Sequence, residues 1–245
     1  MTSRRKIMLV TGGSRGIGRA VVELAIEQNY AVCINYAQAA EEAESLVKQA
    51  EQAGTEAIAV KADVSDKQQT DRLFEQIDTR FGQLDVLVNN AGIVGKASRL
   101  HDISEARLQN IVGVNIAGAV YCAAAAVRRM STAQGGSGGS IVNVSSIAAQ
   151  LGGPNEYVDY AMTKGALDSM TTGLAKEVAT EGIRVNAVRP GLIYTDIHAS
   201  GGEPGRVDRL AHLVPMQRGG TAMEVARAIL SVSYTHLTLP TTPYV

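Results

Sequence analysis

Short runs rich in β-branched residues alternate with longer amphipathic stretches along most of this chain. The short runs predict strands at residues 6–11, 31–36, 56–61, 84–89, 140–145 and 183–189. The longer stretches predict helices at residues 16–29, 40–53, 67–81, 104–130, 156–180 and 221–230. Such alternation is typical of βαβ units, whose strands pair in parallel and whose helices cover both faces of the sheet. The sequence therefore predicts an α/β fold with a single doubly wound parallel sheet.

The size and composition of the chain fit a globular protein. Its 245 residues are 45% hydrophobic and 19% charged, and the formal net charge is −1, so we expect no nucleic-acid partner. We expect neither a signal peptide nor an apolar run of membrane-spanning length. Cys33 and Cys122 lie far apart in apolar stretches, which predicts buried free thiols in a reducing compartment. These features together indicate a cytoplasmic protein.

Tyr160 and Lys164 lie four residues apart in one of the predicted helices. That spacing places a phenol and an ammonium on the same helix face, about one turn apart. A neighbouring positive charge stabilises the phenolate and lowers the pKa of a Tyr from its ordinary value of about 10. The pair is therefore a candidate general acid–base catalyst. The alternative is an interfacial Tyr beside a solvated Lys, because chance matches to this spacing are frequent.

A glycine-rich segment, TGGSRGIG at residues 11–18, follows the first predicted strand and opens the first predicted helix. Phosphates bind at such junctions because free backbone N–H groups and the positive end of the helix dipole face the ligand. Gly12, Gly16 and Gly18 would let the backbone approach a ligand closely. The position of the segment favours dinucleotide binding over a plain tight turn.

The residues near this turn favour NADP over NAD. NAD-binding sheets usually carry an acidic residue at the end of the second strand, to bind the ribose hydroxyls. Here that position reads Ile34-Asn35-Tyr36-Ala37, without a carboxylate. Arg15 lies inside the turn, where its guanidinium could bind a 2′-phosphate. The alternative for Arg15 is an ordinary surface charge, and NAD remains possible.

Further short motifs follow in a fixed order, and together with the turn they resemble the short-chain dehydrogenase/reductases up to Leu230. The segments are TGGSRGIG at residues 11–18, Asp63-Val64, Asn89-Asn90-Ala91-Gly92, Asn115, Ser145-Ser146, YAMTK at residues 160–164 and Arg189-Pro190-Gly191. The resemblance implies a Rossmann-like sheet. It also implies an NAD(P)-dependent oxidoreductase that interconverts a carbonyl and a secondary alcohol by hydride transfer.

The resemblance assigns catalytic roles to four residues. Tyr160 would exchange a proton with the substrate oxygen, and Lys164 would lower the pKa of Tyr160 and bind the nicotinamide ribose. Ser146 would orient and polarise the substrate oxygen. Asn115 would help to hold a water molecule that links Lys164 to solvent.

The cofactor site implied by the turn and by the resemblance extends to the segment after the last strand. Asp63 would contact the adenine amino group, with the Val64 backbone beside it. The full set is Gly12, Ser14, Arg15, Gly16, Ile17, Gly18, Asn35, Tyr36, Asp63, Val64, Asn89, Ala91, Gly92, Tyr160, Lys164, Pro190, Gly191, Ile193 and Thr195. No metal is expected, because the histidines are scattered along the sequence.

The choice of catalytic serine depends on an unusual spacing. In the family the serine usually lies thirteen residues before the tyrosine, whereas Ser146 lies fourteen before Tyr160 and Ser145 fifteen. We predict that Ser146 is catalytic, because the second serine of such a pair is the usual one. Tyr157 is expected to form part of the pocket wall, and residues 194–216 are expected to form a substrate lid or a plain surface loop.

Two other functions remain open on sequence grounds, namely a lyase or epimerase and a non-catalytic dinucleotide sensor on the same fold. We expect one dinucleotide-binding and catalytic domain at residues 1–230. Residues 231–245 contain no Asp, Glu, Lys or Arg and resemble a translated sequencing adapter, so we expect a non-native tail that replaces the last strand. The alternative is a genuine edge strand with a Pro-rich end. The resemblance to the short-chain dehydrogenase/reductases implies that the full-length parent is a homotetramer that acts on a small carbonyl or alcohol. We expect no membrane partner.

Overall fold

The computed structural model describes residues 4–234, and its centre is a parallel sheet of six strands. The strands are β1 (Ile7–Val10), β2 (Ala31–Tyr36), β3 (Ala57–Lys61), β4 (Val86–Asn89), β5 (Gly139–Val144) and β6 (Ile183–Val188). They pair in the order β3-β2-β1-β4-β5-β6, and every pairing is parallel. This arrangement confirms the predicted doubly wound sheet. Because the order reverses between β1 and β4, ligands are expected at the carboxyl ends of these two strands.

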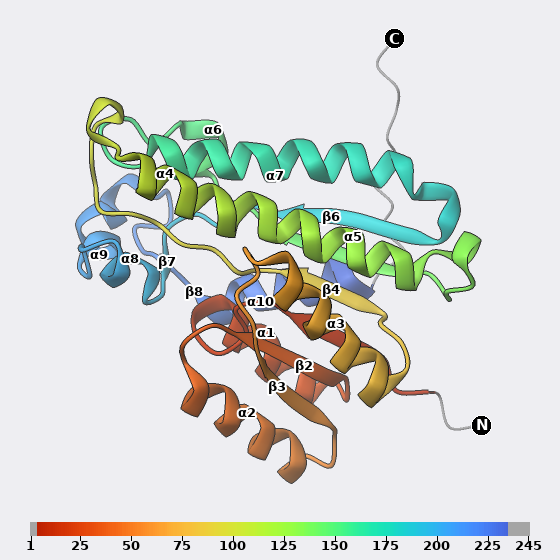
Figure 1. The fold of residues 1–245 in the computed structure, drawn as a ribbon. Helices are drawn as coiled ribbons and strands as arrows, with labels where there is room; N and C mark the ends of the chain where they lie inside the picture. Colours follow the sequence, from red (N-terminus) through yellow and green to blue (C-terminus); the bar gives the residue numbers. More distant parts are fainter. Residues whose placement is uncertain (1–3, 235–245) are drawn as a thin grey trace.

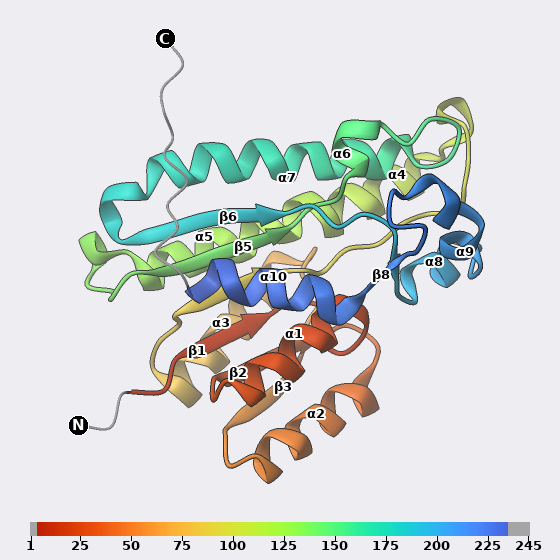
Figure 2. The ribbon, with the colours of Figure 1, turned by 180° about the vertical axis from the view of Figure 1, so that it is seen from behind.

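Helices cover both faces of the sheet, as Figures 1 and 2 show from opposite sides. One face carries α1 (Gly16–Glu27), α2 (Ala40–Gln52) and α10 (Ala222–Tyr234), and the other carries α3 (Lys67–Phe81), α5 (Ala119–Met130) and α7 (Val158–Glu177). Successive side chains of a strand point to opposite faces. In β1, Met8 and Val10 therefore join the first layer, whereas Ile7 and Leu9 join the second. Burial on both faces explains why the strands are nearly continuous apolar runs.

The helix predicted at residues 104–130 is continuous but not uniform. After α4 (Glu105–Val112), a π-helical turn (Gly113–Gly118) leads into α5. The Ser104 hydroxyl caps α4 by accepting a hydrogen bond from the Arg107 amide at 3.2 Å. Single π turns inside α-helices occur frequently at functional sites, and this one contains Asn115.

The same helical run corrects the expectation that no stretch reaches the length of a membrane span. Glu105–Met130 is long and apolar enough to cross a membrane, by length and composition only. In the fold, 44% of its most apolar window is buried. Cys122, Ala126 and Met130 belong to the core on that face of the sheet. The apolar character of the run is therefore explained by its contact with the core.

Several short elements near the carboxyl ends of the strands lie outside the sequence prediction. They are α6 (Ala148–Leu151), β7 (Ile193–Tyr194), α8 (Ile197–Ser200), α9 (Arg206–Leu210) and β8 (Gly220–Thr221). β7 and β8 pair in parallel, apart from the main sheet. Elements of two to five residues are too short for a periodic apolar pattern, so tertiary contacts decide where they form.

The last helix is longer than the sequence predicts. α10 continues to Tyr234, so the predicted end at residue 230 is wrong. Arg184 of β6 explains the extension, because its guanidinium donates hydrogen bonds of 2.8 Å to the carbonyl oxygens of Val232 and Ser233. These bonds satisfy two carbonyls that a helix end leaves free. The remainder of the predicted tail, residues 235–245, lies outside the described residues; within residues 4–234, β6 pairs with β5 alone.

Candidate active site

The turn between β1 and α1 has the backbone conformation that a phosphate site requires. Gly12 and Gly16 have φ angles of 60° and 54°, which favour glycine. A Cβ atom on Gly18 would lie 2.2 Å from the carbonyl oxygen of Gly12. The turn therefore folds tightly over the start of α1, where backbone N–H groups are free to bind an anion. Arg15 is exposed at this position, whereas Ser14 is buried.

Asn90 fixes this turn from the end of β4, a role that the sequence analysis missed. Its side-chain amide donates hydrogen bonds to the carbonyl oxygens of Thr11, at 2.9 Å, and Gly12, at 3.1 Å. The Thr11 hydroxyl accepts hydrogen bonds of 3.0 Å from the backbone amides of Asn90 and Ala91. The four bonds tie the carboxyl ends of β1 and β4 together at the point where the strand order reverses. A polar residue directly after a buried strand was the available signal.

Asn35 holds the same turn from β2. The side chain is buried, at 2% exposure. Its oxygen accepts a hydrogen bond from the Gly12 amide at 3.3 Å, and its nitrogen donates to the Ala62 carbonyl at 2.9 Å. Because both ends of the amide bind backbone, the Asn35 side chain positions the turn. Tyr36, the next residue, is only partly buried.

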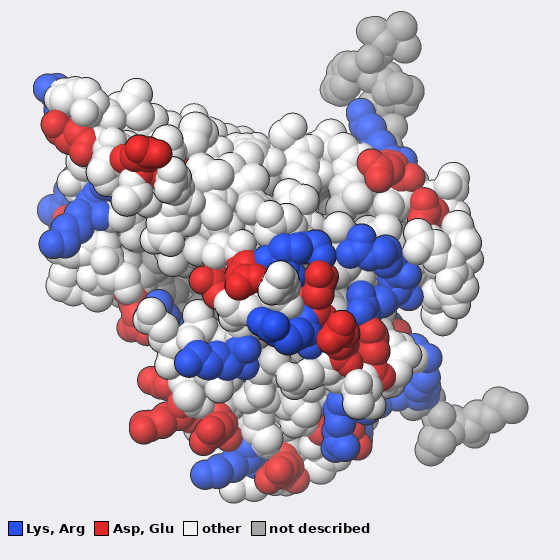
Figure 3. Space-filling view, in the orientation of Figure 1, with Lys and Arg blue, Asp and Glu red and all other residues white. Residues whose placement is uncertain are grey.

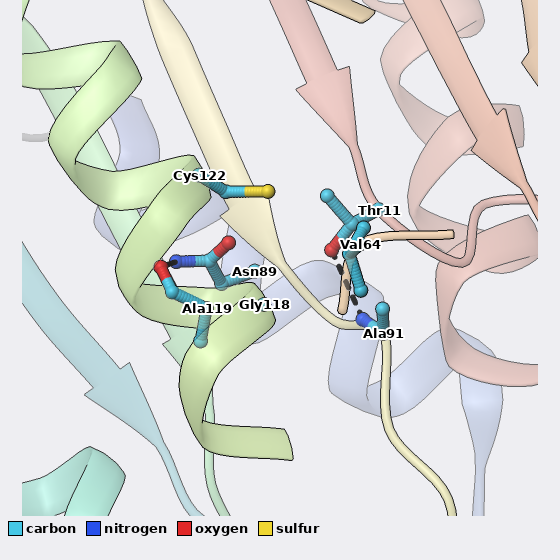
Figure 4. A pocket seen from close by; sticks show the side chains of 7 residues that line it. All are labelled: Thr11, Val64, Asn89, Ala91, Gly118, Ala119 and Cys122. Carbon is cyan, nitrogen blue, oxygen red and sulfur yellow. Dashed lines mark hydrogen bonds between the residues drawn. The ribbon is translucent and has the colours of Figure 1, made fainter. Parts of the chain in front are cut away.

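A small pocket lies next to this junction, and three of the predicted cofactor residues line it. Val64, Asn89 and Ala91 meet there, and the remaining lining residues are Thr11, Gly118, Ala119 and Cys122 (Figure 4). Asn89 is buried and donates hydrogen bonds to the Ala119 carbonyl, at 3.2 Å, and to the Asn143 side chain, at 3.0 Å. These bonds hold the Asn89 side-chain nitrogen against α5 and β5, whereas its oxygen has no hydrogen-bond partner among the described residues.

Tyr160 and Lys164 lie on one face of α7, as their spacing predicts. The Lys164 ammonium is 5.5 Å from the centroid of the Tyr160 ring. Lys164 is buried, at 3% exposure, and donates a hydrogen bond of 2.7 Å to the carbonyl oxygen of Val144 at the end of β5. The helix thus places both groups at the carboxyl edge of the sheet.

Burial shifts the pKa values of this pair. Burial raises the pKa of Tyr160, and the hydrogen bond with Ser146 offsets only part of that rise. Burial also lowers the pKa of Lys164 to about 8, against the opposing effect of the Asp168 carboxylate. The lowering of the Tyr160 pKa by Lys164 stays a prediction. The Lys164 ammonium is hydrogen-bonded to the Val144 carbonyl oxygen, and burial is a larger effect on the Tyr160 pKa than the Ser146 hydrogen bond.

The two serines after β5 have different partners. The Ser145 hydroxyl is buried and donates a hydrogen bond of 3.1 Å to the Lys164 carbonyl oxygen, so it fastens α7 to the sheet. The Ser146 hydroxyl accepts a hydrogen bond from the Ala148 amide at 3.1 Å and is hydrogen-bonded to Tyr160. Of the two, only Ser146 is in contact with the Tyr160 phenol.

Asn115 joins this group from the π turn. Its oxygen accepts a hydrogen bond of 2.8 Å from the Ile93 amide, and its nitrogen donates to the Ile93 carbonyl at 3.0 Å and the Thr163 hydroxyl at 3.1 Å. A Cβ atom on Gly92 would lie 3.5 Å from both the Asn115 oxygen and the Lys164 nitrogen. Gly92 therefore lies directly between these two side chains.

A buried ion pair, not anticipated from the sequence, supports the start of α7. Arg107 of α4 binds Asp159 through two hydrogen bonds of 2.7 and 2.9 Å, and the Asp159 side chain is 1% exposed. Asp159 also accepts a hydrogen bond of 2.9 Å from the Tyr160 amide. The ion pair thus fixes the backbone that carries the phenol.

The remaining predicted residues lie around the same edge of the sheet. Asp63 is exposed and accepts hydrogen bonds from the amide and hydroxyl of Ser65 at 2.9 and 2.7 Å. Thr195 reaches the glycine-rich turn, since a Cβ atom on Gly16 would lie 3.5 Å from its side chain. Ile17, Pro190 and Ile193 are partly buried and Gly191 is exposed.

The segment expected to be a lid lies against the loop before α7. Arg206 of α9 contacts Glu156 at 2.6 Å and stacks over the Tyr157 ring at 4.8 Å. Arg206 also pairs with Glu203, which in turn binds Arg209 at 2.5 Å. The Tyr157 side chain is therefore covered from the lid side, which agrees with a place in the pocket wall.

The chain is similar to known proteins both in sequence and in structure. The family described as short chain dehydrogenase matches residues 6–204. The uncharacterized oxidoreductase YgfF of Escherichia coli K12 is 52% identical over 224 residues, covering 91% of both chains. The 3-oxoacyl-[acyl-carrier-protein] reductase FabG of Staphylococcus aureus is 33% identical, covering 91% of this chain and 89% of the relative.

Among solved structures, a short chain dehydrogenase from Burkholderia cenocepacia J2315 in complex with NADP is similar, with a TM-score of 0.84 and 34% identity. The match covers 93% of this chain and 90% of that one. With a family match over most of its length and relatives well above 30% identity, the chain is a member of the short-chain dehydrogenase/reductase family of NAD(P)-dependent oxidoreductases.

Proposed function

We propose that this chain reduces a small-molecule carbonyl compound to a secondary alcohol with NADPH, and that Tyr160 supplies the proton. The observation that carries the proposal is the grouping of Tyr160 with Ser146 and Lys164 at the carboxyl edge of the sheet. The glycine-rich turn lies at the same edge, after β1. When bound, the nicotinamide would supply the hydride.

The residues present fit a dinucleotide phosphate. The turn over α1 leaves no room for a side chain at Gly18, so backbone N–H groups can approach a pyrophosphate. Arg15 is exposed beside it, and the end of β2 carries no carboxylate that would repel a 2′-phosphate. The NADP bound to the Burkholderia relative supports the same choice.

The proposed chemistry follows from the charges around Tyr160. Because burial raises its pKa, Tyr160 keeps its proton at neutral pH and is ready to donate it to a developing alkoxide. Ser146 would hold the substrate oxygen beside the phenol. Lys164, with a pKa of about 8, is mainly charged at pH 7 and would favour the phenolate that remains. These states favour the reductive direction.

The phenylalanine variant of Tyr160 tests this proposal. Y160F should lower kcat at least about 100-fold, because the proton donor is removed, while the dissociation constant for NADPH should change little. The control is Y157F, which removes a neighbouring phenol and should leave kcat largely unchanged. The assay follows nicotinamide absorbance with ketones, sugars and acyl thioesters as substrates. Full turnover by Y160F would refute the assigned role.

The same assay separates the competing functions. A lyase or epimerase would convert substrate without a net change in nicotinamide absorbance, and a sensor would bind NADPH without any turnover. The name of the Staphylococcus aureus relative recommends 3-oxoacyl thioesters as the first substrates to try.

We also infer that residues 1–230 form one catalytic domain in a cytoplasmic protein that assembles as a homotetramer. The free thiols support the location, since Cys33 and Cys122 are both buried and unpaired. The outer faces of α4, α5 and α7 support the assembly. Leu108, Val120 and Met162 are exposed there, at 40%, 42% and 50%. In Figure 3 the surface over the middle of α7 is largely free of charged side chains.

A further inference from the structure

Asp168 lies one helical turn beyond Lys164 on α7 and has no part in the chemistry described above. The Arg189 guanidinium, just after β6, donates a hydrogen bond of 2.8 Å to one carboxylate oxygen of Asp168. The other oxygen, Oδ1, is buried and has no hydrogen-bond partner among the described residues. The Asp168 side chain is only 17% exposed. An unsatisfied carboxylate oxygen in a buried position is costly, so the arrangement calls for a compensating interaction.

Lys164 carries a positive charge one turn earlier on α7, and it interacts with Asp168 at longer range than a direct ion pair. The two residues are spaced i and i+4 on one helix, which places their side chains on the same face. The carboxylate of Asp168 raises the pKa of Lys164 and thereby opposes the effect of burial. The other groups around Lys164 are Tyr160, the Val144 carbonyl and the neutral Asn115 amide. Among them Asp168 alone carries a negative charge.

We propose that Asp168 is a positioning residue for the reaction, which keeps Lys164 charged inside the protein, and that Arg189 limits the strength of this effect by neutralising the carboxylate in part. The proposal rests on the assigned roles of Tyr160 and Lys164. It adds two charged groups to the active site, the Asp168 carboxylate on α7 and the Arg189 guanidinium just after β6.

The direction of the effect on pH dependence follows from the charges. Reduction needs the proton on Tyr160 and the positive charge on Lys164, so activity is lost as pH rises through the pKa of Lys164. Removing the negative charge of Asp168 lowers that pKa. The alkaline limb of the pH profile, where activity falls as pH rises, then moves to lower pH. Removing the positive charge of Arg189 leaves the carboxylate less neutralised, raises the pKa of Lys164 and moves the limb to higher pH.

The test is the pH profile of kcat/KM for carbonyl reduction by NADPH in D168N and R189Q. We expect the alkaline limb to shift down by about one pH unit in D168N, and to shift up in R189Q. The conservative variant D168E keeps the charge and should keep the wild-type limb. Ser169 is exposed on the same helix, so S169A is the matched control and should leave the profile unchanged.

A merely structural role predicts a different result. Loss of packing or of the Asp168–Arg189 ion pair would lower the activity of D168N and R189Q alike. It would not shift the alkaline limbs of the two variants in opposite directions. An unmoved limb in D168N, or shifts in the same direction in both variants, would overturn the proposal. Should D168N fail to fold, a limb in R189Q that stays in place would overturn it, and an upward shift would support it. The Y160F variant reports separately on the proposed function, since full turnover there refutes the acid–base assignment whatever the limb does.

Discussion

At the scale of single residues, the active site is a place where charge is buried at a cost to stability. Lys164 has a pKa of about 8 in the fold against an ordinary 10.5. Below pH 8 the folded and unfolded states both hold the proton, and the fold bears the whole cost of the buried charge, about 3 kcal/mol. Between pH 8 and 10.5 the folded state has already lost the proton, so this cost declines as pH rises.

Replacing Lys164 by Met should therefore stabilise the protein while abolishing turnover. At pH 7 we expect the free energy of unfolding to rise by about 1–2 kcal/mol, because the lost hydrogen bond to Val144 offsets part of the gain. The gain should shrink as pH rises from 8 to 10.5. Urea unfolding across this range measures it. The control is K176M, at an exposed position of the same helix, and a destabilised K164M at pH 7 would contradict the prediction.

At the scale of elements, the junction of β1, α1 and β4 depends on close backbone contact. In G18A the new Cβ atom would lie 2.2 Å from the Gly12 oxygen and 2.5 Å from the Asn90 amide nitrogen. The first contact lies within the turn and the second is with the side chain that fixes it from the end of β4, so the turn has to move. We expect a loss of about 3 kcal/mol in stability and much weaker NADPH binding.

The matched substitution is G173A, in the exposed middle of α7, where a Cβ atom would meet nothing within 4 Å. It should stabilise the protein by about 0.5–1 kcal/mol, through the lower backbone entropy of Ala. Thermal unfolding and NADPH titration of the two variants test the pair. Equal effects of G18A and G173A would show that the turn is not tightly packed.

At the scale of the whole molecule, the face formed by α4, α5 and α7 should join copies of the chain. Met162 and Val120 are exposed on this face. Each Lys substitution there would bury an unpaired charge in the interface, so M162K and V120K should dissociate the assembly. Analytical ultracentrifugation measures the mass. Q52K, on α2 at the far side of the molecule (Figure 1), is the control and should leave the mass unchanged. Intact tetramers in both M162K and V120K would place the interface elsewhere.

The sequence by itself determined the fold class and the main elements, because these depend on local periodicity. All six strands and the long helices were predictable, since each has enough residues to repeat an apolar pattern. The glycine-rich turn and the Tyr160–Lys164 spacing could also be identified from the sequence, because each is formed by residues close together in the chain. The extension of α10 to Tyr234 was not, because it depends on Arg184, a residue of a distant strand.

Only the tertiary structure decided what each polar side chain does. Asn35 and Asn89 lie in segments that the sequence predicts to bind the cofactor. In the structure their side-chain amides bind backbone groups and another side chain inside the protein. Burial raises the pKa of Tyr160, an effect that the spacing to Lys164 could not reveal. Desolvation and hydrogen-bond partners are properties of the packed chain. The sequence determines which groups are close along the chain. Only the fold determines which of these groups are buried and which are exposed to solvent.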